Sequence, residues 1–479
     1  MYDGLGLYID GKWRPSNSGR TFKILNPANE EVLGELPVAD EKNLDEALAA
    51  AQKGLAVWRK TTSWERSKVM RKVADLLRER AESIARTLTL ESGKPLPEAR
   101  LEVGAAADQF DWFADEARRI YGQTIESRIP NVRNFLRYEP VGVVAAFTAW
   151  NFPVVLVARK IAPALAAGCS IIVKPAEDDP AAGLAIVQAC HDAGVPPGVV
   201  NAVVGDPPFI SSYLLASPIT RKVTLTGSIP VGKQLLKLAA DTVKRASMEL
   251  GGHAPFIVFE DADLAHAAEL GVKTKFRNNG QVCVSPTRFF VHESKLEDFT
   301  ERFIAGVKKI KIGNGLEEGV DVGPLINKKR LDWINDLVED SRKNGATIAS
   351  GGRQPTGFNR GYFYEPTVIT GLKDTDKIMT TEPFGPVALI TSFKEFDEVM
   401  ARANQLPFGL ASYCFTRSLK TANEAFEQLE TGIVGVNHCA IATAELPFGG
   451  MKESGMGREG GSLGIKDFLE PKYATMLLN

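Results

Sequence analysis

The first quarter of the chain carries the residue spacing of amphipathic helices. Before these helices, residues 7–13 are typical of a β-hairpin, because a short apolar run is followed by an Asp10-Gly11 turn. Thr62 and Glu65 then form a capping box ahead of apolar residues that recur at helical spacing. This pattern predicts long helices that extend to about residue 120.

The pattern changes after the helices. Residues 121–140 are polar, contain Pro130 and Pro140, and predict a strand at 135–138 that leaves the domain. The chain then alternates between predicted strands at 141–149, 170–173, 199–204, 222–226 and 245–249 and helices such as 154–167 and 181–193. A second alternating region covers 254–435. Such alternation predicts parallel sheets with ligands beyond the carboxyl ends of the strands.

Composition excludes several classes of protein. The 479 residues allow about three domains of roughly 150 residues, and the net charge of −2 comes without the basic patch that nucleic-acid binding requires. No apolar run approaches the roughly 18 residues that cross a bilayer, and the first residues do not form a signal peptide. Five cysteines without a CxxC pair argue against disulfides and structural zinc. We therefore expect a cytoplasmic protein that needs no metal and binds neither nucleic acid nor membranes.

Four predicted strand ends carry candidate chemistry. The first is Thr148-Ala149-Trp150-Asn151-Phe152-Pro153, where the Asn151 amide can point at a developing negative charge. Taken alone, this segment is better explained by an Asn that caps the following helix.

The second strand end is Lys174-Pro175-Ala176-Glu177. Lys174 can bond ribose hydroxyls, whereas Glu177 can accept a hydrogen bond from an adenosine ribose and would repel a 2′-phosphate. This arrangement favours NAD over NADP. The alternative is an ordinary surface ion pair.

The third strand end is Thr226-Gly227-Ser228-Ile229-Pro230-Val231-Gly232-Lys233, a glycine turn that opens a helix and suits a phosphate. It nearly matches the P-loop pattern, but Gln234 stands where that motif needs a hydroxyl for Mg²⁺, which excludes an NTPase. A separate G-x-G-x-x-G at Gly455, Gly457 and Gly460 lies near the C-terminus with no βαβ unit after it, so we expect a flexible loop there.

The fourth strand end, Glu249-Leu250-Gly251-Gly252, places a carboxylate before an open turn, although Glu249 could also serve as a cap. A nucleophile is suggested by Cys283, which follows the polar turn Arg277-Asn278-Asn279-Gly280-Gln281-Val282 and can be exposed. The contexts of Cys169, Cys190 and Cys414 instead fit small buried side chains.

Together these motifs resemble the aldehyde dehydrogenase superfamily. The motifs that carry the resemblance are Trp150-Asn151-Phe152-Pro153, Lys174-Pro175-Ala176-Glu177, Thr226-Gly227-Ser228, Glu249-Leu250-Gly251-Gly252, Gly280-Gln281-Val282-Cys283, Glu382-Pro383-Phe384-Gly385-Pro386 and Pro447-Phe448-Gly449-Gly450. They follow the family's order and spacing over essentially the whole chain.

The resemblance implies an α/β fold in three parts. A Rossmann-like NAD-binding domain would hold residues 1–118 and 142–250, and an α/β catalytic domain would hold 251–445. A small β arm for oligomerisation would come from 119–141, with the C-terminal segment 446–479. Family members form homodimers or homotetramers by pairing arm strands, so we expect a homo-oligomer.

The resemblance also implies a mechanism. The Cys283 thiolate would add to an aldehyde, and the oxyanion would lie between the Asn151 amide and the Cys283 backbone N–H. Hydride would pass to NAD, with NADP possible, and Glu249 would activate the water that releases the acid. The residues that the resemblance assigns to the cofactor are Thr148, Trp150, Lys174, Glu177, Gly227, Ser228, Gly232, Leu250, Glu382 and Phe384.

Within the superfamily the chain is most similar to succinate-semialdehyde dehydrogenases. Lys275-Phe276-Arg277-Asn278, the Gly455–Gly460 run and Arg159 match that branch, and Arg159 is expected two helical turns from Asn151 on the same face. Arg159 and Arg277 would therefore bind a distal carboxylate of the substrate. Succinate semialdehyde is expected first, with glutarate or α-ketoglutarate semialdehyde, or a general aldehyde, as alternatives.

Two positions depart from that branch. Ser285 stands where many members carry a second cysteine that acts as a redox switch, and the loop 437–443 lacks the usual carboxylate-binding serines. Cys439 in this loop could replace the switch by pairing with Cys283, although an inert buried thiol is the simpler expectation.

Three rival functions have discriminating features. A CoA-acylating relative would lack the base, yet Glu249 is present, and a structural relative would lose the nucleophile, yet Cys283 is retained. A simple nucleotide-binding module would need neither residue.

Overall fold

The larger half of the computed structural model is built on an eight-stranded sheet whose five central strands are parallel. The structure describes residues 2 and 4–478. In spatial order the strands are β19 (Gly455–Met456), β11 (Arg245–Glu249), β10 (Thr220–Thr226), β7 (Val143–Phe147), β8 (Ser170–Lys174), β9 (Val200–Ala202), β1 (Leu7–Ile9) and β2 (Lys12–Arg14). The predicted parallel sheet and hairpin are thus confirmed, although β7 and β9 are shorter than predicted.

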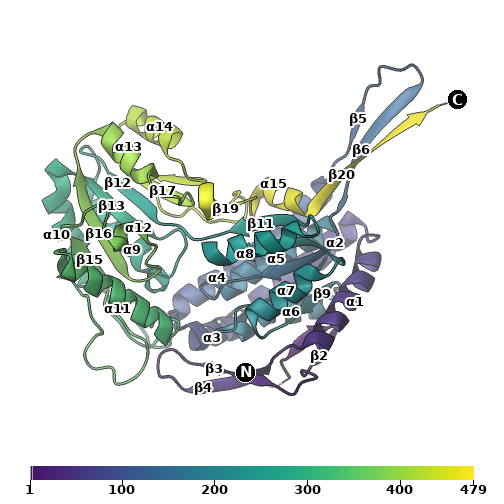
Figure 1. Ribbon diagram of the computed structural model, residues 1–479, viewed down its shortest axis with the longest axis horizontal. Helices are drawn as coiled ribbons and strands as arrows, with labels where there is room; N and C mark the ends of the chain where they lie inside the picture. Colours follow the sequence, from purple (N-terminus) through teal and green to yellow (C-terminus); the bar gives the residue numbers. More distant parts are fainter. Residues whose placement is uncertain (1, 3, 479) are drawn as a thin grey trace.

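Helices surround this sheet (Figure 1). They are α1 (Glu41–Trp58), α2 (Ser63–Glu79), α3 (Ala81–Ser92), α4 (Leu96–Glu116), α5 (Pro153–Ala167), α6 (Pro180–Ala193), α7 (Pro207–Ala216), α8 (Ile229–Ala240) and the short α15 (Gly461–Gly464). Gly93 adopts a left-handed φ of 76° and ends α3, so the predicted helical region divides into separate helices. Periodicity also missed the hairpin of β3 (Thr21–Leu25) and β4 (Val32–Pro37).

Helix α5 is the internal helix of this half. All fifteen of its residues are buried, including the charged pair Arg159 and Lys160. An apolar sequence on every face explains the burial, because such a helix has no side suited to water. The helix starts shortly after the carboxyl end of β7, so its two buried cations lie near this edge of the sheet.

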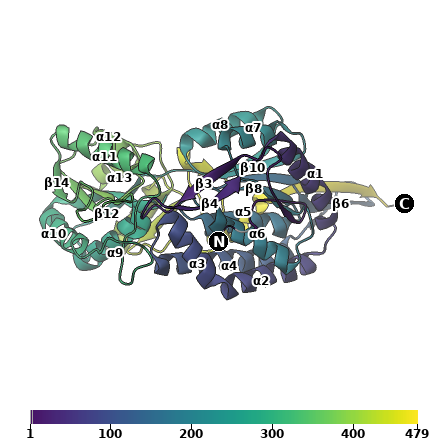
Figure 2. The same cartoon turned by 90° about the horizontal axis from the view of Figure 1, so that it is seen from below.

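The second half contains a seven-stranded sheet that is parallel except for one edge strand (Figure 2). In spatial order it contains β14 (Thr347–Ser350), β15 (Thr367–Thr370), β16 (Val387–Phe393), β13 (Pro286–His292), β12 (Ala254–Val258), β17 (Ala411–Phe415) and β18 (Ile433–Val436). Its helices are α9 (Leu264–Phe276), α10 (Leu296–Val307), α11 (Lys328–Lys343), α12 (Lys377–Thr380), α13 (Phe396–Asn404) and α14 (Leu419–Gln428). Only residues 250–253 separate β11 of the first sheet from β12 of the second.

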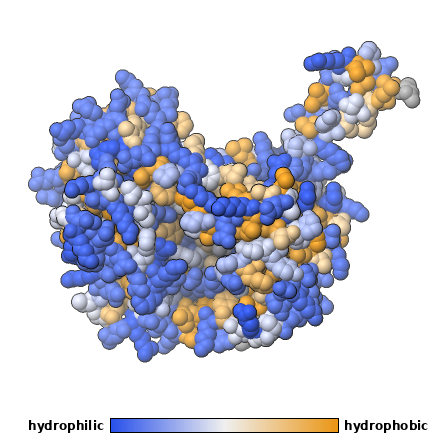
Figure 3. All heavy atoms as spheres, viewed as in Figure 1, coloured by the Kyte–Doolittle hydropathy of each residue, from blue (hydrophilic) through white to orange (hydrophobic). Residues whose placement is uncertain are grey.

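A three-stranded antiparallel arm projects from the first half (Figure 1). It consists of β20 (Leu469–Leu477), β6 (Val132–Pro140) and β5 (Gln123–Ile125), with β6 in the centre. Apolar side chains are visible on its surface (Figure 3), and Tyr473 and Leu477 are 77% and 66% exposed. Among the described residues no helix is long and apolar enough to cross a membrane.

The structure corrects the expectation for the glycine run near the C-terminus. Gly455 and Met456 form β19 and pair with β11, so this part of the run is a strand. Gly455 has φ 142°, and a Cβ there would lie 2.1 Å from the Met248 carbonyl oxygen. The close backbone approach therefore explains at least the first glycine.

Candidate active site

The turn that delivers Cys283 is left-handed at three consecutive residues. Asn278, Asn279 and Gly280 have φ values of 47°, 55° and 70°. Asparagine is one of the few residues that tolerate this conformation, and at Gly280 a Cβ would lie 2.1 Å from the Gly385 carbonyl oxygen. The Asn-Asn-Gly sequence is thus required by the turn that leads to Cys283.

Asn151 lies against this turn. Its Nδ2 donates to the Gln281 carbonyl at 3.1 Å, and its own carbonyl accepts from Asn278 Nδ2 at 2.9 Å. Asn151 precedes α5, which begins at Pro153 after Phe152 as N-cap. The expectation that Asn151 and Arg159 share one helix face was therefore wrong, since only Arg159 is on the helix.

Two glycines after Glu249 allow the junction between the sheets to approach its neighbours closely. A Cβ on Gly252 would lie 2.9 Å from the Cys283 carbonyl oxygen, and one on Gly251 would lie 2.4 Å from Glu382 Oε2. The Gly252 N–H donates to Glu382 Oε1 at 3.1 Å. The Glu-Leu-Gly-Gly motif thereby brings Glu249, Cys283 and Glu382 to one place.

Cys283 and Glu249 have linked protonation. Burial raises the pKa of the Cys283 thiol well above 9, Glu249 adds to the rise, and Arg159 opposes it. Burial also raises the pKa of Glu249 to about 8, with Glu459 adding to the rise and Lys160 opposing it. Burial therefore favours the uncharged form of both groups.

Lys160 and Glu459 form a buried ion pair beside Glu249 that sequence reasoning missed. Lys160 Nζ also donates to Thr224 Oγ1 at 3.1 Å, and Glu459 accepts from Thr226 Oγ1 at 3.3 Å. A lysine within an otherwise apolar helix and an acid within a glycine-rich run were the available signals.

The segment predicted to bind phosphate is a turn that leads from β10 into the N-terminus of α8. Helix α8 begins after Ser228, whose side chain makes no capping bond within the described residues, and the Gly227 N–H donates to the Glu249 carbonyl at 3.0 Å. A Cβ on Gly232 would lie 2.7 Å from the Leu250 side chain. These glycines let the helix N-terminus lie close to the sheet, an arrangement that suits a diphosphate.

Lys174 and Glu177 form an ion pair at the end of β8, with 2.7 Å between Lys174 Nζ and Glu177 Oε2. Lys174 is buried and the Glu177 side chain is 45% exposed, so Glu177 is the member of the pair that faces solvent. Nearby, the Thr148 hydroxyl is buried without a partner among the described residues. An unpaired buried hydroxyl is consistent with a polar ligand at this edge.

Two aromatic residues of the predicted cofactor site contact each other. Trp150 and Phe384 meet edge to face with ring centroids 5.4 Å apart, and Phe384 has a left-handed φ of 51°. The Arg330 guanidinium, from α11, lies 5.8 Å and 5.5 Å from the two rings. Sequence reasoning missed Arg330 because no motif marked it.

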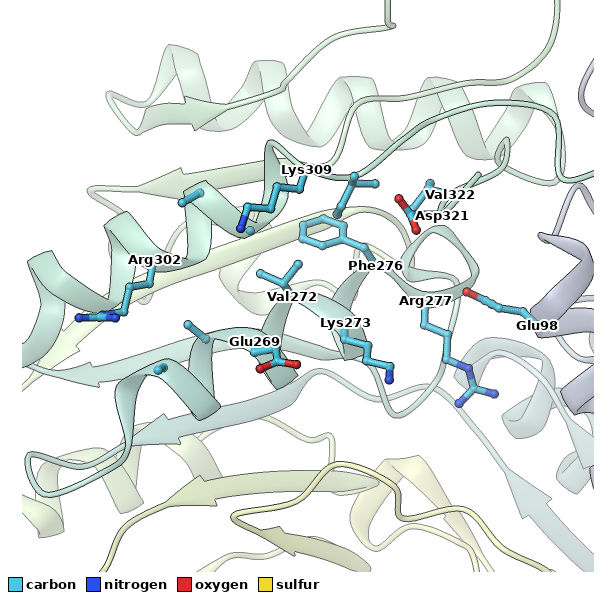
Figure 4. A pocket seen from close by; sticks show the side chains of 15 residues that line it. Glu98, Glu269, Val272, Lys273, Phe276, Arg277, Arg302, Lys309, Asp321 and Val322 are labelled. Carbon is cyan, nitrogen blue, oxygen red and sulfur yellow. The ribbon is translucent and has the colours of Figure 1, made fainter. Parts of the chain in front are cut away.

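The two predicted substrate arginines occupy different depths. Arg159 is 7% exposed, and its guanidinium lies 4.5 Å from the Phe448 ring. Arg277 is exposed, lies 5.0 Å from the Phe152 ring and lines a cavity of about 780 Å³. Figure 4 shows it beside Glu98 at one end of this cavity. Among the described residues neither arginine has a carboxylate within 4.0 Å.

Cys439 and Cys283 pack against the same apolar cluster, and both contribute to raising the pKa of the Tyr413 hydroxyl. Burial raises the pKa of Cys439 to about 11, which disfavours its thiolate. A redox role for Cys439 stays a prediction.

A buried carboxylate, a thiol whose pKa it raises and a helix N-terminus after β10 are features typical of cofactor-dependent enzymes that use covalent catalysis. The model of the "Aldehyde dehydrogenase family" matches residues 13–474, so the chain belongs to this family. It is an NAD(P)-dependent aldehyde dehydrogenase of the semialdehyde dehydrogenase type.

Similar proteins cover nearly the whole chain. Glutarate-semialdehyde dehydrogenase of Pseudomonas putida is 43% identical, with 97% of this chain and 96% of that protein aligned. The succinate-semialdehyde dehydrogenase [NADP(+)] of Escherichia coli K12 is 41% identical over the same shares. The crystal structure of an E. coli NADP-dependent enzyme superposes with TM-score 0.98 at 40% identity, covering 100% of this chain and 99% of the other. The predicted family, fold class and activity are thus confirmed.

The raised pKa of Glu249 predicts the pH dependence of turnover. A base must be ionised to accept a proton, so steady-state turnover should rise with pH through about 8. Glu249→Gln should remove this limb and leave a pre-steady-state NADH burst of about one per active subunit, followed by slow turnover. Loss of the burst together with turnover would show that Glu249 acts before the thioester forms.

Proposed function

We propose that the enzyme oxidises an aldehyde with a distal carboxylate, with succinate semialdehyde as the first candidate. The observation that carries this proposal is Arg159. It is a buried cation in the electrostatic field of Cys283 and Glu249, and no carboxylate among the described residues lies within 4.0 Å of it. A buried charge is costly unless it is paired, so a substrate carboxylate would complete the site.

The proposed reaction uses the residues that meet at the junction of the two sheets. Cys283 gives its proton to solvent and attacks the aldehyde carbon as the thiolate, and the oxyanion is stabilised by the Asn151 amide and the Cys283 backbone N–H. A nicotinamide cofactor, which Glu382 and Phe384 would help to hold, would supply the hydride acceptor that lets the tetrahedral centre become a thioester. Glu249 then takes a proton from the water that releases the acid.

The Lys160–Glu459 pair supports the role of Glu249. Glu459 raises the pKa of Glu249 and Lys160 lowers it, so small movements of this pair change the basicity of the carboxylate. The neighbouring cation Arg159 lowers the pKa of Cys283, which favours the thiolate.

A second candidate substrate is glutarate semialdehyde, which is one carbon longer. The similar Pseudomonas putida protein bears this activity in its name, and the loop 437–443 lacks the serines of the succinate branch. Arg277 is exposed and Arg159 is buried, so the two cations offer a substrate carboxylate contacts at two different depths.

We propose NAD as the preferred cofactor, with NADP as a possible second. The Glu177 carboxylate is the exposed member of its ion pair with Lys174. It can accept a hydrogen bond from a ribose hydroxyl and would repel a 2′-phosphate. Thr148, Trp150, Gly227, Ser228, Gly232, Leu250, Glu382 and Phe384 complete the proposed cofactor site. The similar E. coli enzyme uses NADP(+), so this preference is a feature to test.

We also propose a homo-oligomer, a dimer or tetramer, that assembles through the arm. Both edge strands of the arm, β5 and β20, leave backbone groups unpaired, and the arm exposes apolar residues such as Ile125 and Tyr473. Unprotected strand edges with apolar side chains are suited to pairing with a second copy.

Cys283→Ala should abolish aldehyde oxidation and leave NADH binding intact, because it removes the only proposed nucleophile. Turnover can be followed by NADH absorbance, with cofactor binding measured by fluorescence in the same preparation. Cys414→Ala is a matched control at a buried thiol outside the site. Normal turnover in Cys283→Ala would falsify the mechanism.

Arg159→Met or Arg277→Ala should lower kcat/KM for succinate semialdehyde about tenfold to a hundredfold, since a charge-assisted hydrogen bond contributes roughly 1.5–3 kcal/mol. With Arg277→Ala, butanal, which has the same chain without the acid, should be affected far less. Arg302→Ala is the control, because Arg302 lines the same cavity as Arg277 but pairs with Asp298. Equal losses on both substrates would assign the arginines a structural role.

Glu177→Ala should raise kcat/KM with NADP relative to NAD, because it removes the charge that repels a 2′-phosphate. Wild type should prefer NAD. A wild-type preference for NADP, or a ratio unchanged by the substitution, would show that the phosphate lies elsewhere.

Light scattering of the purified enzyme should give two or four times the 52.0 kDa chain mass. Tyr473→Asp, on the exposed arm, should shift the mass toward the monomer because it places a charge in the proposed interface. A monomeric wild type would contradict the arm assembly.

A further inference from the structure

A buried ion pair beneath α5 takes no part in the proposed chemistry. The side chains of Lys94 and Glu102 are 0% and 1% exposed and contact each other through Lys94 Nζ and Glu102 Oε2. Lys94 precedes α4, and Glu102 lies on α4. A buried pair is not by itself a strong source of stability, because desolvation offsets the attraction. Its remaining hydrogen bonds therefore show what the pair holds.

Glu102 caps α5 from another helix. Its Oε1 accepts from the Val154 and Val155 backbone N–H groups at 2.9 Å and 3.3 Å. The local N-cap residue, Phe152, has no side chain that can accept these bonds. A carboxylate at this position satisfies donors that would otherwise be buried unpaired and interacts favourably with the helix dipole.

Lys94 holds the residues just before the helix. Its Nζ donates to the Asn151 carbonyl at 2.9 Å and lies 4.0 Å from the centre of the Phe152 ring. The same Asn151 carbonyl accepts from Asn278 Nδ2 at 2.9 Å. The pair therefore connects α4, the start of α5 and the turn that leads to Cys283.

We infer that Lys94 and Glu102 are positioning residues for aldehyde oxidation. Lys94 fixes the Asn151 backbone and Glu102 fixes the first turn of α5, so the Asn151 amide is aimed at the oxyanion and the helix presents Arg159 at a set depth. The inference rests on the proposed function, because it takes Asn151 as the oxyanion donor. Neither residue touches the reacting atoms.

Removing Lys94 should slow thioester formation. In Lys94→Met the rate of the NADH burst should fall roughly tenfold or more, the size expected when a charge-assisted hydrogen bond is lost. The KM for NAD should change much less than the burst rate, since most of the proposed cofactor residues, Thr148 and Trp150 excepted, lie on other elements. The matched control is Arg78→Met, which breaks an exposed pair between α2 and α4 through Asp108 and Asp111.

A double-mutant cycle separates positioning from general destabilisation. Asn151→Ala alone should slow the burst about a hundredfold, as loss of an oxyanion donor does. In the Lys94→Met background the further loss should be clearly smaller, because the amide is already displaced. A merely structural role would leave the two effects multiplicative, and that result would overturn the inference.

The outcomes distinguish this inference from the proposed function. If Asn151→Ala leaves the burst rate unchanged, the proposed oxyanion donor is wrong. If it slows the burst and the effects multiply, only the positioning role is wrong. If Lys94→Met does not fold, Lys94→Met combined with Glu102→Gln removes both charges, keeps an oxygen that accepts from the Val154 and Val155 N–H groups, and should fold. Its burst should remain slow, and a wild-type burst rate would overturn the inference.

Discussion

The close backbone approach at the junction of the two sheets is the constraint on which the site depends. Glu249 ends the first sheet, and the two glycines that follow leave room for the Cys283 carbonyl and the Glu382 carboxylate. A side chain at either glycine would push the second half away. This covalent connection between the halves is thus also the place where the candidate nucleophile, base and cofactor ligand meet.

Around this junction, charge is buried in linked pairs. Lys160 with Glu459 lies next to Glu249, and Lys94 with Glu102 lies under the start of α5. Lys160 and Glu459 join α5 to a segment near the C-terminus, and the hydrogen bonds of Lys94 and Glu102 join α4 to the start of α5. Each pair thereby fixes relative positions that apolar packing alone would leave less specific. Arg159 is the exception, since it has no such partner among the described residues.

Much of this arrangement was predictable. Strand ends followed by glycine or a polar residue indicated the catalytic edge, and the motifs around Asn151, Glu249 and Cys283 are local in sequence. Lys94 and Glu102 were not found because their role depends on a helix far away along the chain. Periodicity also failed at the glycine run near the C-terminus, because backbone pairing in β19 leaves no pattern in side-chain polarity.

The order of the elements along the chain has a consequence for biosynthesis. Glu459, β19 and β20 all belong to the last part of the chain, yet they complete the first sheet, the arm and the pair with Lys160. While the ribosome still covers these residues, Lys160 has no acid to neutralise it, and the edge of β11 is open. The helix that carries Arg159 therefore reaches its native environment only after the segment from β19 to β20 has been synthesised.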